Sequence, residues 1–184
     1  MSDENSSGSV LSHFWSPLTA VGSHGERGAN AQICVPIFGA SIVPDRPRLL
    51  VNLSKTNYTT GLVTESGSLA ITVLAEGQLQ LLELLGLHSG RDIDKLRGLD
   101  VELTDAGDPW FRGGVAAIDC RVIDSHDLGD SIAFLCGVRN ERRMDEERPL
   151  PWASARQLVG DDFLRRWAEK SQREREIAYQ TMRW

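Results

Sequence analysis

The sequence of 184 residues predicts a mainly β domain built as a barrel or a sandwich. Seven short runs rich in Val and Ile fill the first three quarters of the chain, and Gly, Asp and Pro separate them as turn residues separate strands. The predicted strands span 17–23, 31–41, 48–54, 69–74, 100–104, 114–125 and 131–140. This spacing is typical of a barrel or sandwich and not of alternating βαβ units.

Two segments between the strands have a helical pattern. The run 58–66 predicts a short helix, because Asn57 or Thr59 can accept hydrogen bonds from its first free backbone N–H groups. The run 76–98 brings five leucines close together before a polar break, and it predicts a helix followed by a second short helix around 94–95. We expect both to pack on the barrel.

The chain changes character near its C-terminus. After the prolines of "RPLPW" the sequence is highly charged, with large apolar groups at partly helical spacing. We therefore expect a tail at 1–12, a single domain at 13–147 and a helical extension at 148–184. Such a helix is more often a solvated surface element or a dimer arm than a catalytic element.

Composition limits the function classes. A formal net charge of -6 and a pI near 5.2 argue against nucleic acid as the main partner, although one anionic cofactor needs only a few local donors. No run reaches the roughly 18 apolar residues that span a bilayer, so we expect a cytoplasmic protein without a membrane partner. Cys34, Cys120 and Cys136 lie in apolar segments and are expected to be buried free thiols.

Side-chain catalysis has little support. There is no G-x-S-x-G elbow, and the four histidines have no spacing that pairs a base with a nucleophile. No His or Cys pair suggests a metal site. The G-x-G-x-x-G and G-x-x-x-x-G-K-[ST] nucleotide motifs are missing as well, so a bound nucleotide would be held by another design.

A run of polar side chains follows the predicted strand 48–54. Hydroxyl, amide and ammonium groups converge there on the start of the helix at 58–66, which suits a monophosphate. The members of this run are Asn52, Ser54, Lys55, Thr56, Asn57, Thr59 and Thr60. The same residues would also serve to cap the helix and solvate a loop, and the local pattern alone favours that second interpretation.

The order of features over residues 14–140 favours the phosphate-site interpretation over the helix cap. Five segments follow one another with the order and spacing of the flavin reductase-like, FMN-binding split-barrel family. They are "GANAQICVPIFGAS", "RLLVNLSKTNYTT", "SGSLAITVL", "DKL" and "LGDSIAFLCGV". The chain resembles that family over about two thirds of its length. The resemblance implies an antiparallel, Greek-key-like split β-barrel with flanking helices and a C-terminal helical extension.

The resemblance also implies a site for FMN, with FAD as a possible substitute. The strand that ends near Ser41 would line the flavin ring, the next would follow the ribityl chain, and the polar run would hold the phosphate. The implied cofactor-binding residues are Cys34, Val35, Pro36, Ile37, Ala40, Ser41, Asn52, Leu53, Ser54, Lys55, Thr59, Thr60, Gly86, His88 and Ser89. The polar run is thereby interpreted as a phosphate clamp.

The implied activity is an NAD(P)H-dependent flavin reductase, with NADH or NADPH as hydride donor. Because hydride would pass from nicotinamide to flavin, no catalytic acid and base are required of the protein, and none is assigned. The resemblance further implies a homodimer and a flavin-dependent monooxygenase that receives reduced flavin. The apolar groups Trp152, Phe163 and Trp167 of the extension would suit a dimer arm.

One departure from the family pattern bears on the donor. Where the family commonly carries Gly-Asp-His, with the histidine on the nicotinamide side, this chain carries Gly129, Asp130 and Ser131. Two alternatives therefore stay open. One is a split-barrel FMN protein that acts without nicotinamide, in electron transfer or as an oxidase. The other is a non-catalytic barrel that binds a small ligand.

Overall fold

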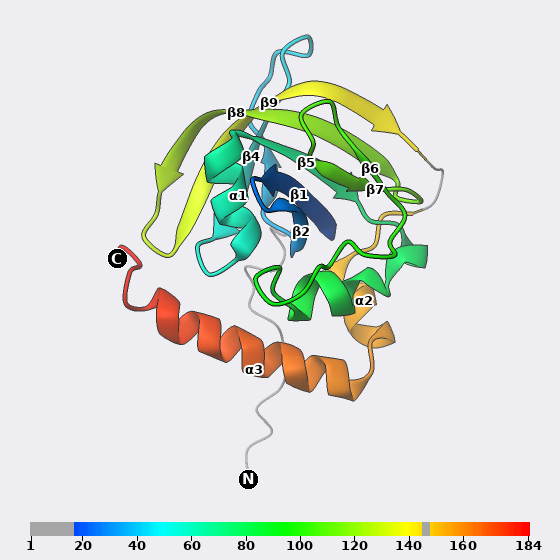
Figure 1. The fold of residues 1–184 in the computed structure, drawn as a ribbon, viewed down its shortest axis with the longest axis vertical. Coiled ribbons are helices and arrows are strands. Elements are labelled where there is room, and N and C mark those ends of the chain that lie inside the picture. The colour runs from blue at the N-terminus through cyan, green and yellow to red at the C-terminus, as the bar shows by residue number, and fades with distance from the viewer. Residues whose placement is uncertain (1–16, 145–147) are drawn as a thin grey trace.

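The computed structural model of the chain describes residues 17–144 and 148–184, so the predicted tail at 1–12 lies outside the described residues. A seven-stranded antiparallel sheet has the order β2-β1-β5-β8-β9-β4-β3, and β6 and β7 form a separate pair (Figure 1). The strands are β1 (Thr19–Gly25), β2 (Gly28–Cys34), β3 (Ile37–Gly39), β4 (Arg48–Ser54), β5 (Ser68–Val73), β6 (Val101–Leu103), β7 (Pro109–Phe111), β8 (Ala116–Asp127) and β9 (Ser131–Arg143).

The sheet curls because its two edge strands are neighbours in the sequence. Only Val35 and Pro36 separate β2 from β3, although the two strands stand at opposite ends of the strand order. Pro36 has no N–H to donate, and its carbonyl oxygen accepts the Asn52 N–H at 3.1 Å. The sequence predicted one strand over 31–41, and the proline divides it into two. The predicted mainly β, split-barrel fold is confirmed.

The β8–β9 hairpin brings the start of β9 beside the first residues of the polar run. Its turn contains Gly129, whose φ of +100° is a conformation that other residues rarely adopt. In the antiparallel register β4 pairs with β9, and Ser54 lies opposite Ser131. The residue in the place of the family histidine is therefore beside the end of the strand that leads into the polar run.

The predicted helix at 58–66 is present as α1 (Tyr58–Ser66), with Asn57 at its N-cap position. The predicted side-chain cap is wrong, because Asn57 makes no capping hydrogen bond and the Thr59 hydroxyl bonds Asn30 instead. The segment 76–98 differs from its prediction. It contains a 3₁₀ turn, η2 (Glu76–Gln78), and a π-helical turn, η3 (Glu83–Leu87). The prediction of a second helix around 94–95 is wrong, because the chain forms turns there. Ser89 Oγ accepts the Arg91 N–H and Asp94 Oδ1 accepts the Leu96 N–H, so these side chains bind local backbone groups in place of a helical ladder.

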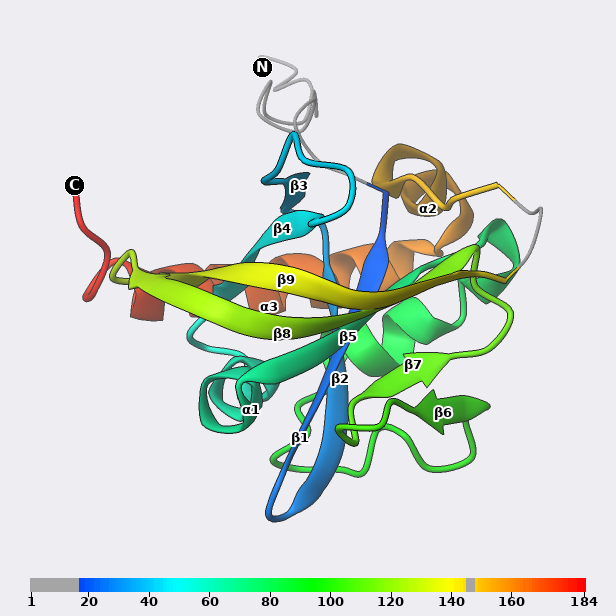
Figure 2. The ribbon, with the colours of Figure 1, turned by 90° about the horizontal axis from the view of Figure 1, so that it is seen from above.

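The C-terminal extension folds back on its own chain. It contains α2 (Trp152–Leu158) and α3 (Asp161–Ala178), and α3 runs across the lower side of the barrel in Figure 1. Figure 2 shows α3 behind the sheet, along the direction of β8 and β9. Phe163 is buried, and Trp167 packs against a core cluster that includes Leu82 and Leu85. The apolar side chains that suggested a dimer arm therefore pack within the chain.

Two apolar clusters account for most of the core. One lies inside the curled sheet, and its largest members are Val21, Val51, Leu53, Val63, Leu69, Ile71 and Phe134. The other lies between the sheet and the C-terminal helices, around Leu18, Leu74, Leu82, Phe111, Leu150 and Phe163. Among the described residues, no helix is long and apolar enough to cross a membrane.

Candidate functional site

A cavity of about 320 Å³ opens where β2, β4, β9 and the C-terminal extension meet. We call it the central cavity. Its lining residues are Leu18, Gln32, Ile33, Cys34, Val35, Pro36, Asn52, Ser54, Asn57, Asp130, Ser131, Trp152 and Trp167. Its size is at the lower end of the range of about 300–1,000 Å³ for small-molecule sites. It combines apolar and aromatic walls with a few polar groups, as such sites do.

Six of the residues that the resemblance assigned to the flavin or to the nicotinamide side line the central cavity together. They are Cys34, Val35, Pro36, Asn52, Ser54 and Ser131. The sheet brings them together because the β2–β3 connection, the end of β4 and the start of β9 are neighbours in space. Segments nearly 100 residues apart in the sequence thus contribute to one site.

Two side-chain amides in this cavity have an oxygen atom without a partner. Gln32 Oε1 and Asn52 Oδ1 are both inaccessible to solvent and accept no hydrogen bond within the described residues. A buried acceptor left without a donor costs about 1–3 kcal/mol. A ligand with N–H or O–H donors would satisfy these oxygens once the two side-chain amides turn toward it. A flavin nucleotide carries an N–H on its pyrimidine edge and hydroxyls on its ribityl chain, so these residues fit it.

The polar run divides into exposed and buried members. Ser54 Oγ is within 2.8 Å of Thr56 Oγ1, near the surface. Thr59 Oγ1 accepts a hydrogen bond from Asn30 Nδ2 at 2.7 Å, and Thr60 Oγ1 donates to the Ser54 carbonyl at 2.6 Å. Both threonines are at most 2% exposed. Their side chains therefore bind Asn30 and the Ser54 carbonyl beside the start of α1, and they do not line the cavity.

Lys55 is at the surface beside the β8–β9 turn. Its ammonium lies 2.6 Å from Asp127 Oδ1, and its backbone N–H donates to the Asp130 carbonyl at 2.9 Å. The Lys55 side chain hydrogen-bonds Asp127, and this is the main reason that the pKa of Asp127 is lowered. The same carboxylate accepts the Gly129 N–H at 2.7 Å. One acidic side chain thus positions both the cation and the turn.

Arg91 was missed by sequence reasoning. Its Nη1 donates to the Thr56 carbonyl at 3.0 Å, and its guanidinium lies 5.5 Å from the centre of the Tyr58 ring. A second cavity of about 590 Å³, the Arg91 cavity, opens on this side and is also lined by Arg27 and Lys95. The polar run therefore lies between two cavities. Arg91 reaches the polar run only because residues 88–99 fold against α1. No local sequence motif therefore predicted this contact.

Several predicted flavin residues do not line the central cavity. Ala40 and Ser41 belong to the β3–β4 connection, where Ser41 Oγ accepts the Val43 N–H at 3.1 Å. Gly86 faces Trp167, and His88 Nε2 lies 3.9 Å from Glu83 Oε1. The other predicted residues outside this lining are Ile37, Leu53, Lys55, Thr59, Thr60 and Ser89.

Burial disfavours thiolate chemistry at the central cavity. All three cysteines are buried and free, and burial raises the pKa of Cys34 to about 12. Its thiol is therefore protonated near neutral pH and is a poor nucleophile. Among residues 17–144 and 148–184 no cluster of His, Cys, Asp and Glu has the arrangement of a metal site.

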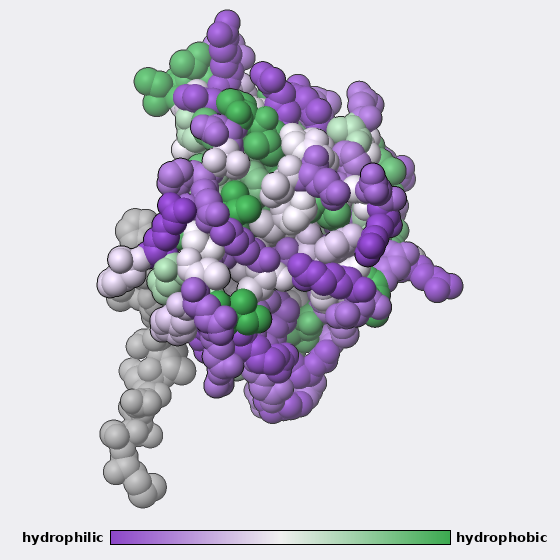
Figure 3. All heavy atoms as spheres, turned by 60° about the vertical axis from the view of Figure 1, so that its left-hand side comes forward, coloured by the Kyte–Doolittle hydropathy of each residue, from purple (hydrophilic) through white to green (hydrophobic). Residues whose placement is uncertain are grey.

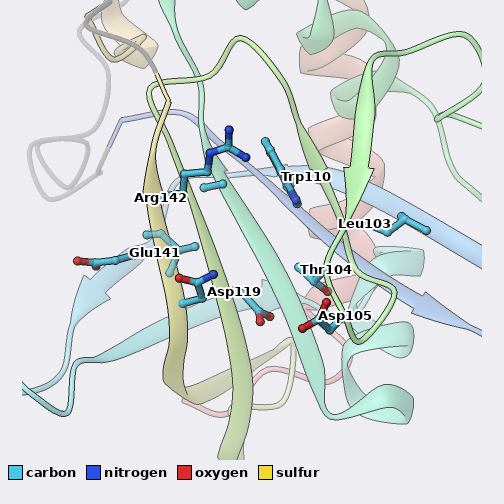
Figure 4. Close-up of a pocket in the computed structure, with 10 residues that line it drawn as sticks. Leu103, Thr104, Asp105, Trp110, Asp119, Glu141 and Arg142 are labelled. Atoms are coloured by element: carbon cyan, nitrogen blue, oxygen red, sulfur yellow. The ribbon is translucent and has the colours of Figure 1, made fainter.

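A third cavity, of about 190 Å³, lies on the far side of β8 and β9 (Figure 4). Arg142 lies over Trp110, with the guanidinium 5.6 Å from the ring centre, and Thr104 and Asp105 face it across the cavity. No residue that the sequence assigned to flavin lines it. The central cavity is therefore the stronger candidate for the functional site.

Comparison with known proteins agrees with this geometry. Residues 11–158 match the family described as the flavin reductase like domain. The chain belongs to this family. The match covers the barrel and α2 and ends before α3, so Trp152 lies within the family region and Trp167 lies beyond it.

Three individual proteins are similar to this member of the family. The reductase subunit HsaB of a flavin-dependent monooxygenase from Rhodococcus jostii is 30% identical over 141 residues, 77% of this chain and 70% of that protein. FMN reductase (NADH) RutF 1 from Methylorubrum extorquens is 25% identical, over 66% of this chain and 57% of that protein. The structure of an FMN-binding protein from Thermus thermophilus with bound 1-cyclohex-2-enone superposes with a TM-score of 0.67 at 27% identity, covering 81% of this chain and 86% of the other.

Proposed function

We propose that the protein is an NAD(P)H-dependent flavin reductase that binds FMN in the central cavity and supplies reduced flavin to a partner monooxygenase. The observation that carries this proposal is the pair of unpartnered amide oxygens, Gln32 Oε1 and Asn52 Oδ1, in a cavity beside a polar run suited to phosphate. Membership of the flavin reductase-like family and similarity to a monooxygenase reductase subunit support the activity and the partner.

Different residues would bind the ring system and the phosphate of FMN. Gln32 and Asn52 would accept hydrogen bonds from the flavin, while Val35 and Pro36 would present backbone and apolar surface to its ring system. Ser54, Lys55, Thr56 and Arg91 would surround the phosphate. When bound, a flavin supplies hydride acceptance from a nicotinamide. The protein then has to bind, orient and shield the ring, which is consistent with a site that has no acid and base pair.

The hydride donor is the part of the proposal with a specific rival. Ser131 lines the central cavity where the family commonly places a histidine, and Ser131 Oγ donates to Asp130 Oδ1 at 3.3 Å. This arrangement favours, as the second candidate, a flavin protein that receives electrons from a donor other than nicotinamide. The family relative named as an NADH-dependent FMN reductase supports NADH as the first choice.

A homodimer is part of the proposal, with the outer face of β3, β4 and β8 as the interface. Apolar side chains gather there, some of them highly exposed, and we call them the β3–β4 patch: Phe38, Ile42, Val43, Leu50 and Ile123. Figure 3 shows apolar atoms near the top of the molecule, where the β3–β4 connection projects. Ile42 is 99% exposed, and a second copy of the chain would cover it.

Sedimentation tests the dimer. Ile42→Asp should shift the protein toward monomer, because a carboxylate would be buried at the interface. Leu158→Asp is the control, since Leu158 is also exposed but lies at the end of α2, away from the patch. A protein that sediments as a monomer without any substitution would overturn the dimer. The buried free thiols also suit the cytoplasmic location that we propose.

The visible spectrum of flavin tests the activity. Purified protein is mixed with FMN without oxygen, and NADH and NADPH are added to separate samples. Bleaching by either nucleotide is the expected result and names the donor. A flavin spectrum that shifts on binding but is bleached by neither would move the function to the second candidate. The absence of any shift would overturn the flavin proposal as a whole.

A further inference from the structure

Two indole rings from the C-terminal extension form one side of the central cavity. Trp152 and Trp167 both line it, together with residues of β2, Val35 and Pro36. Their ring centres are 5.2 Å apart and their planes are inclined by 38°. The sequence interpretation placed both residues on an arm for dimer formation, so it assigned them no contact with a ligand.

The position of Trp167 is set from several sides. Its ring packs against Phe163, with 5.8 Å between the ring centres. A Cβ atom at Gly86 would lie 2.7 Å from Trp167 Cζ3, so only glycine lets the indole approach η3 this closely. Arg166, the preceding residue on α3, forms an ion pair with Glu83 of η3 at 2.5 Å. The indole is therefore held in place before any ligand binds.

The far end of the extension is anchored beside Ser131. A Cβ atom at Gly129 would collide with the backbone of Thr181, and the Arg183 N–H donates to the Leu128 carbonyl at 3.4 Å. The segment from α3 to Arg183 thus runs from η3 to the β8–β9 turn, and the central cavity lies between these two anchors. Residues beyond the family region consequently take part in enclosing the cavity.

We propose that Trp167, together with Trp152, is the aromatic wall that contacts the bound flavin and slows its release, so that the C-terminal helix is part of the flavin site in the same chain. The proposal rests on the proposed function, since it takes flavin as the ligand of the central cavity. An indole beside an isoalloxazine gains both buried apolar area and favourable ring contact. These two residues position the flavin and take no part in proton or hydride transfer.

The test uses the full-length chain with FMN and measures the fluorescence of the bound flavin, its affinity and its release rate. An indole in contact with a flavin quenches its emission by electron transfer, so the emission of bound FMN should be low. Trp167→Phe should raise this emission several-fold with a small change in affinity, and the double variant with Trp152→Phe should raise it further. Trp167→Ala should weaken binding about three- to tenfold, mainly through faster release.

Trp110→Phe is the matched control, because Trp110 is also largely buried but lines the cavity on the far side of β8 and β9. It should change neither emission nor release. The unfolding temperature without flavin shows whether each variant is folded, and Trp167→Phe keeps a ring against Phe163. Unchanged emission and release in the Phe variants, with normal FMN binding, would overturn the aromatic wall and leave the proposed function intact. An unsubstituted protein that binds no FMN would overturn the proposed function itself.

Discussion

Lys55 Nζ lies 2.6 Å from Asp127 Oδ1, so the ammonium that the sequence assigned to a phosphate already has an acidic partner. Both side chains are at the surface, 35% and 53% exposed, where such pairs contribute little to stability. The pair instead keeps the Lys55 side chain beside the β8–β9 turn. A phosphate at the polar run would compete with Asp127 for the same cation.

Loss of the Lys55 charge should weaken FMN binding selectively. We expect Lys55→Ala to cost about 1–3 kcal/mol of FMN affinity, because a charge-assisted contact to phosphate is lost. Riboflavin has no phosphate, so its affinity should change little. Titration of both ligands checks this, with Lys170→Ala as a control that removes the same charge from α3. Equal losses for FMN and riboflavin would remove Lys55 from the phosphate site.

Asp127→Asn should have the opposite effect and tighten FMN binding. The substitution keeps an acceptor for the Gly129 N–H but removes the negative charge that competes with phosphate for Lys55. The gain should shrink as salt is added, because exposed charges are screened. Asp124→Asn, at another exposed position on β8, should leave the affinity unchanged. Weaker binding by Asp127→Asn at low salt would contradict the competition.

Arg91→Ala should also weaken FMN more than riboflavin. Its guanidinium is held at the polar run by the Thr56 carbonyl and the Tyr58 ring. Arg91→Lys keeps the charge but loses the planar, forked donor, so it should restore only part of the affinity. Arg97→Ala, on the same loop, serves as the control. Equal FMN affinities for Arg91→Ala and the unsubstituted protein would place the phosphate away from the Arg91 cavity.

The titration of Lys95 should make the free energy of unfolding depend on pH. Its side chain is 3% exposed, and burial, helped by the charge of Lys170, lowers the pKa of Lys95 from 10.5 to about 8. Between about pH 8 and 10.5 the unfolded chain therefore holds a proton that the folded chain has lost, so this residue makes stability rise with pH. The gain is about 3 kcal/mol across the window and is absent below pH 8.

Lys95→Met removes this titration, although it also removes the hydrogen bond from Lys95 Nζ to the Leu85 carbonyl at 3.3 Å. Urea unfolding of both proteins from pH 7 to pH 10.5 checks the prediction. The difference between the two curves isolates Lys95 from other groups that titrate in this range. A difference that is constant across the window would show that the ammonium of Lys95 is not held at a lowered pKa.

The attachment of α3 can be tested by stability. Phe163 is 7% exposed within the core cluster, so Phe163→Ala should lower the free energy of unfolding by about 3 kcal/mol. Ile177→Ala on the same helix should change it by less than about 0.5 kcal/mol, because Ile177 is 55% exposed. Chemical denaturation measures both. Equal small effects would mean that α3 does not pack on its own chain in solution.

Local pattern in the sequence was sufficient for most of the fold. Alternating apolar runs and turn residues predicted most of the strands, because burying one face of a strand leaves a short-range signal. The helix at 58–66 was predicted with the bounds that α1 has. The second helix near residue 95 was wrong because Ser89 and Asp94 bind local backbone groups, a competition that apolar periodicity does not reveal.

The candidate site, like the fold, was predicted from the sequence only where local pattern was sufficient. The sequence by itself determined the polar run, the residues of the β2–β3 connection and the resemblance that joined them to a flavin. Only the tertiary structure decided that Thr59 and Thr60 are buried, that Arg91 reaches the polar run, and that Trp152 and Trp167 enclose the cavity. The reason is distance along the chain. Trp167 and Gln32 are 135 residues apart in the numbering, and only the packing of α3 on η3 brings the two around one cavity.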